Sequence, residues 1–389
     1  MRILVLAQSA GLGGVESSLI NFVRHLVRRG DHVAVVFWRD AGPVRDALPA
    51  SVEIIDVQTG LAGGVYRTGG LSSALQVPSL WGRGKALGFL ALRKILRCYR
   101  NPWILLNRID EDFDVAIAFR HQGYGPYYLI DRVRARKKIM WYHHGAYDPS
   151  QMGEAVDRYY FGKMDAVVAV AEPTRAMLVA RFPSLTGRVR VIPNIIDADE
   201  IRRKALEPVS PSGSAAQTGL NLLTVSRLSA EKGVDIAIRT ARVLRDRGLN
   251  FTWHVIGEGP ERGELQRLAD HLKVEDNFVL RGESANPFPA MLHADLYVQT
   301  SRVEAHPLTI QEAMVLGKPI VASGIPSIAA VLEDGFLGVL SELGPEAFAD
   351  AIEMLAGSSE TRATFASRLA QHRPPNERVF AEIDELLAE

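Results

Sequence analysis

The sequence predicts an α/β protein of two domains, each with a parallel β-sheet that helices cover on both faces. Short runs rich in valine, isoleucine and leucine alternate with segments of helical spacing, which is typical of such sheets. The length of 389 residues allows two or three domains at roughly 150 residues each. The alternation breaks once, at residues 208–216, where proline, serine, glycine and alanine give the composition of a linker.

The first half of the chain begins with a strand expected at residues 2–7. Gly11, Gly13 and Gly14 lead from this strand into a helix at 15–29, which Gly30 ends. Further strands are expected at 32–38, 52–57, 115–119, 138–142, 166–169 and 188–192.

The second half repeats the alternation beyond the linker and ends in helices. Strands are expected at 221–225, 252–256, 277–280, 296–299 and 319–322, with helices near 234–247, 261–272 and 307–316. We divide the chain into a first domain, a hinge or linker, a second domain and a terminal helical segment, at 1–198, 199–218, 219–371 and 372–389. Two such domains form a cleft between them, where ligands commonly bind.

The composition is that of an ordinary globular protein. Apolar residues make up 47% and charged residues 23% of the chain, which excludes wholesale disorder. The 45 basic and 45 acidic side chains cancel, and this neutral balance argues against a dedicated nucleic-acid-binding protein. The single cysteine, Cys98, excludes an internal disulfide and a cysteine-rich zinc site, and it fits a reducing compartment.

The sequence contains no run of the roughly 18 apolar residues that a membrane-spanning helix needs. The apolar run at residues 1–7 meets a glycine loop instead of a small-residue cleavage site, so a buried strand is expected there and not a signal peptide. We therefore expect a cytoplasmic protein, which at most sits on the inner surface of a membrane.

One segment, residues 81–108, departs from the neutral balance. It holds seven basic residues and no acidic one, which leaves 38 basic and 45 acidic residues in the rest of the chain. Leucine, phenylalanine, tyrosine and tryptophan lie between the basic residues, as in a cationic amphipathic helix that binds an anionic membrane surface. A helix packed on the first domain with its charges in water is the alternative.

The glycine loop at residues 11–14 lies between a strand and a helix, so its backbone N–H groups could hold an anion. In a dinucleotide-binding fingerprint the third glycine would fall at position 16, where this chain has Glu16. A carboxylate there repels phosphate and disfavours nicotinamide-dependent oxidoreductase chemistry. A plain tight turn explains the loop equally well.

The second half holds a more specific group of charged residues. Arg227 and Lys232 lie between a buried strand and a helix, where two cations suit a diphosphate, although a solvated charged turn would have the same composition. Glu304 lies in the loop after the strand at 296–299. Pro307 suits a first helical position, which leaves the N–H groups of Leu308 and Thr309 unpaired for an anion.

Glu312 lies one turn into the helix that follows Pro307. Its carboxylate can accept two hydrogen bonds from a sugar diol. An exposed helical carboxylate near a favourable dipole end is the common alternative.

These motifs resemble the donor half of the retaining nucleotide-sugar glycosyltransferases of family four, which have two Rossmann-like domains facing across a cleft. The similarity runs from about residue 222 to 323 and is most specific in its two glutamates. Its motifs are Arg227 with Lys232, Gly257-Glu258-Gly259-Pro260, Glu304 with Glu312, and the segment 316–322. In the first half, Gly13-Gly14-Val15-Glu16 resembles the family's opening loop, and 191–197 resembles its hinge entry. His306 departs from the family, in which many members carry an aromatic residue.

The resemblance implies a role for each matching residue. Arg227 and Lys232 would stabilise charge on the leaving diphosphate, while Glu304 would face the donor sugar and Glu312 the ribose. The rest of the donor pocket would come from Gly13, Gly14, Gly257, Arg281, Gly282, His306, Pro307, Leu308 and Thr309. The resemblance also implies that residues 372–389 return to the first domain.

Three histidines in the first half are candidates for a further role. The family often places a functional histidine after the strand at 138–142, and His144 before Gly145 matches it better than His143 does. Adjacent histidines point in different directions, so a shared metal is not expected. His121 after the strand at 115–119 is a third candidate. A structural, hydrogen-bonded histidine is the alternative at each position.

The resemblance predicts transfer of a sugar from a nucleotide diphosphate donor, preferably a UDP-sugar, to a saccharide or lipid-linked acceptor in cell-surface polysaccharide or glycolipid synthesis. Front-face attack would keep the anomeric configuration, and neither a metal nor a cofactor is implied. No nucleic-acid partner is expected. Two alternatives share the architecture: a nucleotide-sugar epimerase and a catalytically silent sugar-nucleotide binding protein.

Overall fold

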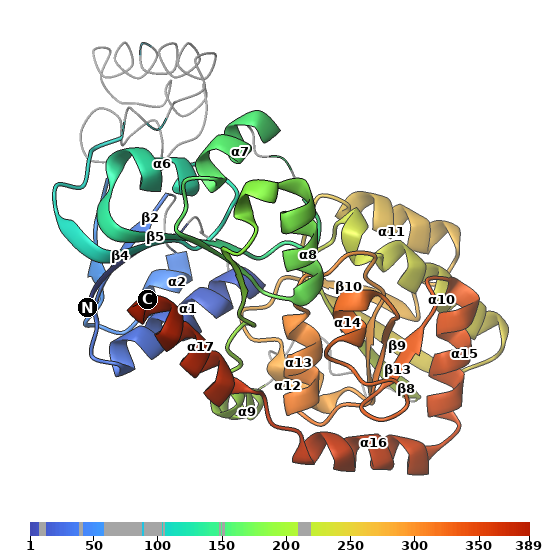
Figure 1. Cartoon of the computed structure of the whole chain (residues 1–389). Helices are drawn as coiled ribbons and strands as arrows, with labels where there is room; N and C mark the ends of the chain where they lie inside the picture. Colours follow the sequence, from blue (N-terminus) through green and yellow to red (C-terminus); the bar gives the residue numbers. More distant parts are fainter. Residues whose placement is uncertain are drawn as a thin grey trace, which may run out of the picture. The chain divides into compact units, whose positions relative to one another are not determined.

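The chain forms two compact units, one at Met1–Ile195 with Glu377–Glu389 and the other at Ile196–Asn376 (Figure 1). This computed structural model describes residues 1–7, 13–38, 42–57, 88, 103, 106–147, 149, 152–208 and 219–389. Each unit has a parallel β-sheet with helices on both faces, which confirms the predicted α/β fold class. Within the described residues, no helix is both long enough and apolar enough to span a membrane.

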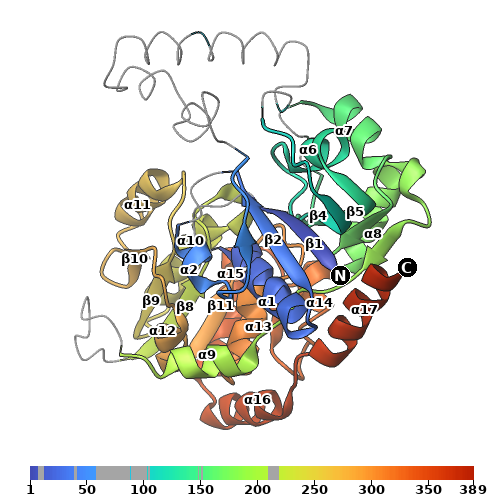
Figure 2. The same cartoon turned by 90° about the vertical axis from the view of Figure 1, so that its left-hand side faces the viewer.

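The first unit is built on a seven-stranded parallel sheet in the order β3-β2-β1-β4-β5-β6-β7, part of which faces the viewer in Figure 2. Its strands read as near-continuous hydrophobic runs because both faces of a parallel sheet are buried. In β1, for example, every residue from Ile3 to Ala7 is buried. The strands are β1 (Arg2–Ala7), β2 (His32–Phe37), β3 (Glu53–Ile54), β4 (Asp112–Ala118), β5 (Arg134–Tyr142), β6 (Ala166–Ala169) and β7 (Val189–Val191).

The helices of this unit present one apolar stripe to the sheet. In α1 the buried residues Leu19, Phe22, Val23 and Leu26 recur at helical spacing. The described helices are α1 (Gly14–Arg28), α2 (Gly42–Ala47), α6 (Gly125–Arg132), α7 (Glu154–Phe161), α8 (Glu172–Arg181), the short η2 turn (Pro183–Leu185) and α17 (Asn376–Ala388).

Most of the basic segment 81–108 lies outside the described residues, and with it the predicted amphipathic helix. Trp103 is described and is fully buried. Its Nε1 donates to Asp131 Oδ2 at 2.7 Å, and its ring packs against Tyr127 and Tyr160 at 4.7 and 5.5 Å between ring centroids. This position of the segment is therefore attached to α6 and α7.

The second unit is built on a six-stranded parallel sheet in the order β10-β9-β8-β11-β12-β13. Counted within the unit, this is the order 3-2-1-4-5-6 of doubly wound nucleotide-binding sheets. The strands are β8 (Leu220–Val225), β9 (Phe251–Ile256), β10 (Phe278–Gly282), β11 (Leu296–Gln299), β12 (Ile320–Ser323) and β13 (Val339–Ser341).

The helices of the second unit include one in the predicted linker. Residues 198–205 form α9, which begins at the capping side chain of Asp197 and buries Ile201 and Ala205, so the first unit ends before residue 198 and the linker is shorter than expected. The remaining helices are η3 (Ala230–Lys232), α10 (Val234–Asp246), α11 (Arg262–His271), α12 (Phe288–His293), α13 (Leu308–Val315), α14 (Pro326–Ala329), α15 (Pro345–Ala356) and α16 (Ser359–Gln371).

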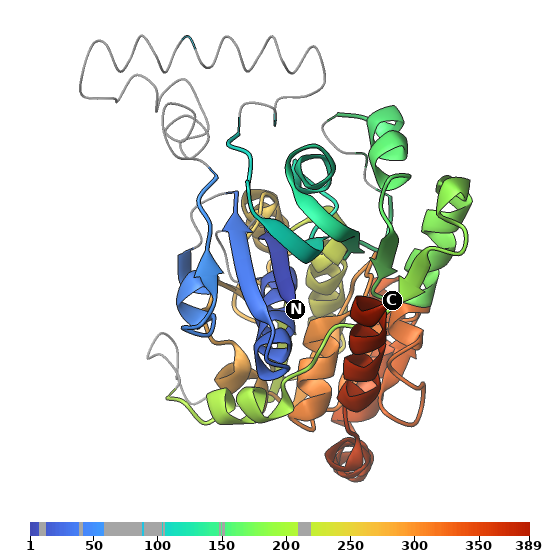
Figure 3. The same ribbon diagram turned by 60° about the vertical axis from the view of Figure 1, so that its left-hand side comes forward.

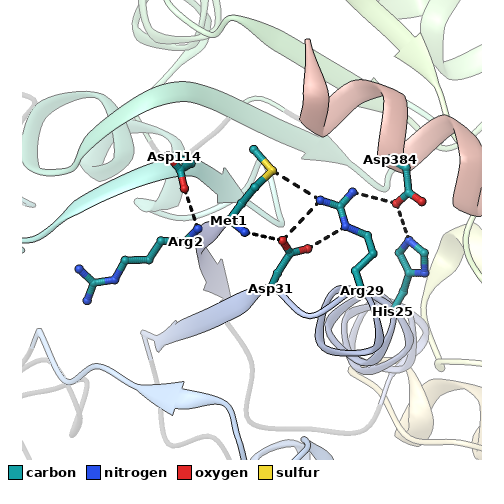
Figure 4. A network of polar contacts seen from close by, with 7 residues as sticks. All are labelled: Met1, Arg2, His25, Arg29, Asp31, Asp114 and Asp384. Atoms are coloured by element: carbon teal, nitrogen blue, oxygen red, sulfur yellow. Dashed lines mark hydrogen bonds and ion pairs between the residues drawn. The ribbon is translucent and has the colours of Figure 1, made fainter.

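The C-terminal helix α17 packs in the first unit, to which the N-terminus also belongs (Figure 3). Asp384 Oδ1 accepts hydrogen bonds from His25 Nε2 and Arg29 Nη1, both at 2.9 Å, and Arg29 also pairs with Asp31 (Figure 4). The His25 ring stacks on Phe380 with 4.4 Å between centroids. Four apolar residues of α17 are buried as well, namely Val379, Ile383, Leu386 and Leu387.

The ion pair at Asp384 yields a prediction for the stability of α17. Burial opposes ionisation of Asp384, but hydrogen bonds from Arg29 and His25 outweigh it and lower its pKa below the ordinary value. Because the carboxylate is partly exposed, Asp384→Asn should cost about 1 kcal/mol at pH 7, which is roughly a fivefold loss of hydrogen-exchange protection in α17.

The pH dependence of this loss follows from the lowered pKa. The contribution of Asp384 is present above its unfolded pKa of about 4 and is lost as the pH falls through the folded value. Glu385→Gln removes a neighbouring exposed carboxylate and should leave exchange unchanged. Equal protection in Asp384→Asn and Glu385→Gln would show that the ion pair does not hold the helix.

Candidate functional site

The candidate site of the second unit lies where its strand order reverses, between β8 and β11. The carboxyl ends of parallel strands meet at one edge of a sheet, and ligands of such sheets bind beside this reversal. Arg227 and Lys232 follow β8, and Glu304 follows β11. The topology therefore brings together charged residues that are distant in the sequence.

Lys232 and Glu304 form an ion pair across this reversal, with 2.8 Å between Nζ and Oε1. The side chains are 20% and 9% exposed, so the pair is largely shielded from water. Glu304 Oε1 also accepts hydrogen bonds from Gln299 Nε2 and Ser301 Oγ, each at 2.8 Å. Within the described part of the chain Oε2 accepts none, which leaves this oxygen for a ligand.

Arg302 joins the same two loops from the solvent side. Its guanidinium makes a bidentate pair with Asp235, with both distances 2.7 Å, and its N–H donates to Glu231 O at 2.8 Å. Gly233 has φ of +64°, and a Cβ there would lie 2.1 Å from Thr300 O. The loops approach so closely that only glycine fits at this position.

Arg227 is exposed, and its guanidinium has no hydrogen bond or ion pair among the residues that the structure describes. The adjacent backbone of Ser226 touches the glycine turn, because a Cβ on Gly257 would lie 1.9 Å from Ser226 O. Gly257 N–H donates to Gly282 O at 2.8 Å. Arg281 is exposed and its Nε donates to His254 Nδ1 at 3.1 Å. Four of the predicted site residues thus gather at the ends of β8, β9 and β10.

Helix α13 begins at Leu308, directly after Pro307, one residue later than the sequence analysis expects. The first N–H groups of a helix, here those of Leu308 and Thr309, have no partner within the helix. Burial lowers the pKa of His306 to about 4, and Gln311 Nε2 lies 3.1 Å from the His306 ring nitrogens. This imidazole is therefore neutral at pH 7.

Glu312 differs sharply from an exposed helical carboxylate. The residue is partly buried, and the loss of hydration on burial raises the pKa of its carboxyl group to about 7. Lys204 on α9 opposes the shift without cancelling it. The helix dipole alone would favour ionisation, so burial is the dominant influence on this group.

In the first unit, the described part of the glycine loop is Gly13 and Gly14, at the start of α1. A Cβ on Gly13 would lie 2.7 Å from Glu16 Oε2, so this carboxylate folds back over the start of the helix. Arg120, which follows β4, lies 3.7 Å from Glu16 Oε1. Gly11 and Leu12 lie outside the described residues.

The structure brings two of the three candidate histidines together. His121 is 3% exposed, and its ring stacks on Tyr142 with 3.8 Å between ring centroids. The ring centroids of His121 and His144 are 6.3 Å apart. Burial, and next the neighbouring His144, lowers the pKa of His121 well below the ordinary value. His144 Nδ1 lies 2.8 Å from Ala146 O, to which the Nδ1–H tautomer donates. His143 packs instead on Phe119.

Sequence reasoning missed the residues that hold Glu304 and Lys232, namely Gln299, Ser301, Arg302 and Asp235. The available signal was Gln299, a polar residue at the end of an otherwise apolar strand. No group of three or more histidine, cysteine, aspartate or glutamate side chains in the described residues could hold a metal ion.

Two family models match the chain. The model described as "Glycosyltransferase Family 4" matches residues 12–200, and the model described as "Glycosyl transferases group 1" matches residues 211–372. Between them they account for most of both units. The chain belongs to glycosyltransferase family 4.

Relatives of this family-4 chain act in several biosynthetic routes according to their names. Alpha-D-kanosaminyltransferase of Streptomyces kanamyceticus is 27% identical over 305 residues, which are 69% of this chain and 75% of that protein. Alpha-monoglucosyldiacylglycerol synthase of Streptococcus pneumoniae is 26% identical over 47% of this chain and 43% of its own length. An uncharacterized glycosyltransferase of Methanocaldococcus jannaschii is 23% identical over 43% of this chain, and the match spans only 41% of that protein.

Solved structures share the fold of this family-4 chain over nearly their whole length. HepE of Anabaena, in complex with UDP-glucose, is 21% identical with a TM-score of 0.72, and the match covers all of this chain and 99% of HepE. TarM of S. aureus, in complex with UDP and glycan ligands, is 15% identical with a TM-score of 0.71 over the whole of both chains.

The buried Glu312 yields a prediction for stability against pH. An acid whose folded pKa is raised binds more protons when folded, so stability falls as the pH rises from the unfolded pKa of about 4.3 to about 7. In Glu312→Gln this loss is absent. Between pH 5 and pH 8 the wild type should therefore lose on the order of 2 kcal/mol relative to the variant.

Urea unfolding at the two pH values, read by pulsed hydrogen exchange in peptides of β9 and β11, measures this difference. Glu346→Gln, which changes an exposed carboxylate of the same unit, is the matched control and should follow the wild type. A Glu312→Gln variant with the same pH dependence as Glu346→Gln would show that Glu312 is ionised when folded.

Proposed function

We propose that this chain transfers a sugar from a nucleotide diphosphate donor, preferably a UDP-sugar, to a saccharide or lipid-linked acceptor. The observation that carries the proposal is the pairing of Lys232 with Glu304 at the strand-order reversal of the second unit, in the loop that also holds the exposed Arg227. This part of the unit therefore offers cations that suit a diphosphate and a carboxylate that suits sugar hydroxyls.

Each group has a chemical role in this proposal. Arg227 binds the diphosphate by forked hydrogen bonds, and Lys232 acts as a point charge on the same group. Both stabilise the negative charge that grows on the diphosphate as it leaves. Glu304 accepts hydrogen bonds from the sugar through Oε2, and Glu312 binds the ribose hydroxyls.

We further propose that the anomeric configuration is retained. The acceptor hydroxyl attacks the anomeric carbon from the face that the diphosphate leaves, the glycosidic bond forms as the C1–O bond to phosphate breaks, and the hydroxyl proton passes to the departing phosphate oxygen. Arg227 and Lys232 supply the positive charge that a metal would otherwise provide.

The comparisons support the choice of UDP and of these acceptor classes. HepE and TarM, which share the fold, bind UDP in their crystal structures. One relative's name describes a glycolipid synthase, which supports a lipid-linked acceptor.

A panel of nucleotide sugars tests the proposal, with transfer and donor hydrolysis followed by mass spectrometry. Glu304→Gln and Lys232→Met should lower turnover by about 10²- to 10³-fold, because each removes an interaction at the reacting diphosphate and sugar. UDP binding, measured by calorimetry, separates the two. Lys232→Met should weaken it, whereas Glu304→Gln should leave it equal or tighter, since the variant releases Lys232 from a competing carboxylate.

Glu346→Gln and Lys273→Met carry the same charge changes on exposed residues of the second unit and should match the wild type. Release of an epimerised nucleotide sugar without an acceptor would instead identify an epimerase. UDP binding without any turnover across the panel would identify a silent binding protein. Either result would overturn the proposed activity.

We also propose that the basic segment 81–108 attaches the enzyme to an anionic membrane surface, where a lipid-linked acceptor lies. Each basic residue near such a surface contributes roughly 1 kcal/mol, which salt weakens. Charge reversal at Arg93, Lys94, Arg97 and Arg100 should therefore abolish salt-sensitive cosedimentation with phosphatidylserine vesicles. Unchanged binding of this variant would exclude the segment as the attachment site.

A further inference from the structure

Gln299 is an unusual residue for its position, the last residue of β11 in the middle of the second sheet. It is 2% exposed, and its neighbours Tyr297 and Val298 are fully buried. A buried amide is costly unless its hydrogen-bonding groups are satisfied, and an apolar side chain is the ordinary choice in a parallel sheet. The amide therefore needs an explanation beyond packing.

Both ends of the Gln299 amide are engaged. Nε2 donates to Glu304 Oε1 at 2.8 Å and to Ser301 Oγ at 2.9 Å. Oε1 accepts from Tyr297 Oη at 2.6 Å and from Thr309 Oγ1 at 3.3 Å. Because an ionised carboxylate only accepts hydrogen bonds, the amide nitrogen must face Glu304 and the amide oxygen must face the two hydroxyls.

The tyrosine fixes the direction of this chain of hydrogen bonds. Tyr297 is fully buried, and burial raises the pKa of its hydroxyl well above the ordinary value, so it remains a donor at any working pH. The carbonyl oxygen of Val225 also lies within reach of this hydroxyl, at the longer distance of 3.2 Å. Donation therefore runs from Tyr297 to Gln299 and from Gln299 to Glu304.

We propose that Gln299 is a positioning residue that fixes the Glu304 carboxyl group through Oε1, so that Oε2 faces the donor sugar. This inference rests on the proposed function. Gln299 reaches Oε1 from the end of β11, and Lys232 reaches the same oxygen from the loop after β8. Through Thr309 the amide also links the Glu304 loop to the first turn of α13. A displacement of a positioned group by about 1 Å can cost about a hundredfold in rate, so such support is consequential.

Two substitutions of Gln299 test the proposal with a UDP-sugar that the wild type turns over. Gln299→Leu keeps the bulk of the side chain and removes the hydrogen bonds. It should lower kcat by about tenfold to a hundredfold while the Kd for UDP changes less than about threefold, because the diphosphate cations are untouched.

Gln299→Glu places a second carboxylate against Glu304. Two carboxylates in contact cannot both ionise readily, so the pair retains a proton to higher pH. The acidic limb of the kcat/KM profile should therefore move up by about one pH unit or more, with activity partly regained as the pH rises. A residue with a merely structural role would not move this limb.

Asn277→Leu is the matched control, because Asn277 is a partly buried amide of the same unit that bonds Phe251 O at the opposite edge of the sheet. It should lower thermal stability without moving the pH profile. Absence of transfer by the wild type with every donor overturns the proposed function and this inference together. An active wild type with unchanged kcat in Gln299→Leu, or an unchanged acidic limb in Gln299→Glu, overturns the role of Gln299 alone. A loss of kcat in Asn277→Leu as large as that in Gln299→Leu would also overturn the role of Gln299.

Discussion

Lys232 and Glu304 are 72 residues apart in the sequence and 2.8 Å apart in the structure, and the candidate site depends on this contact. The sheet creates it, because reversal of the strand order places the loops after β8 and β11 side by side. The approach is close enough that Gly233 must lack a side chain opposite Thr300 O. Arg302 then clamps the same loops through Asp235. Backbone packing and charge pairing thus converge on one geometry.

The two glutamates of the second unit show how differently one sheet edge can treat the same functional group. Glu304 faces an ammonium group, an amide and a hydroxyl, all of which donate to its Oε1. Burial raises the pKa of Glu312 to about 7, and the charge of Lys204, which favours ionisation, does not cancel this shift. The groups that surround a carboxyl group, and not its place after a strand or on a helix, therefore determine its environment.

Much of the fold follows from local pattern. The runs of valine, isoleucine and leucine predict strands such as β1 and β11 almost at their observed bounds, because burial on both faces leaves a signal within each segment. The same reasoning singles out Arg227, Lys232 and Glu304, since charged residues directly after buried strands are conspicuous. The same reasoning wrongly includes most of α9 in the predicted linker, because the partners that bury Ile201 lie far away in the sequence.

The support for the site was harder to predict. Gln299 and Asp235 support the site only through their contacts with Glu304 and Arg302. No local spacing in the sequence predicts a contact between such distant loops. Burial of the Glu312 carboxyl depends in the same way on how α13 packs. Residues that act through another residue leave a weaker trace in the sequence than residues that carry charge themselves.

The return of α17 to the first unit makes that unit discontinuous in the chain. All of Ile196–Asn376 lies between the last strand of its sheet and its final helix. During synthesis from the N-terminus, the chain of the second unit is therefore completed before the helix that pairs with His25 and Arg29 is made. The later-made unit can therefore finish first, and the earlier one is closed only by a helix that is made after it.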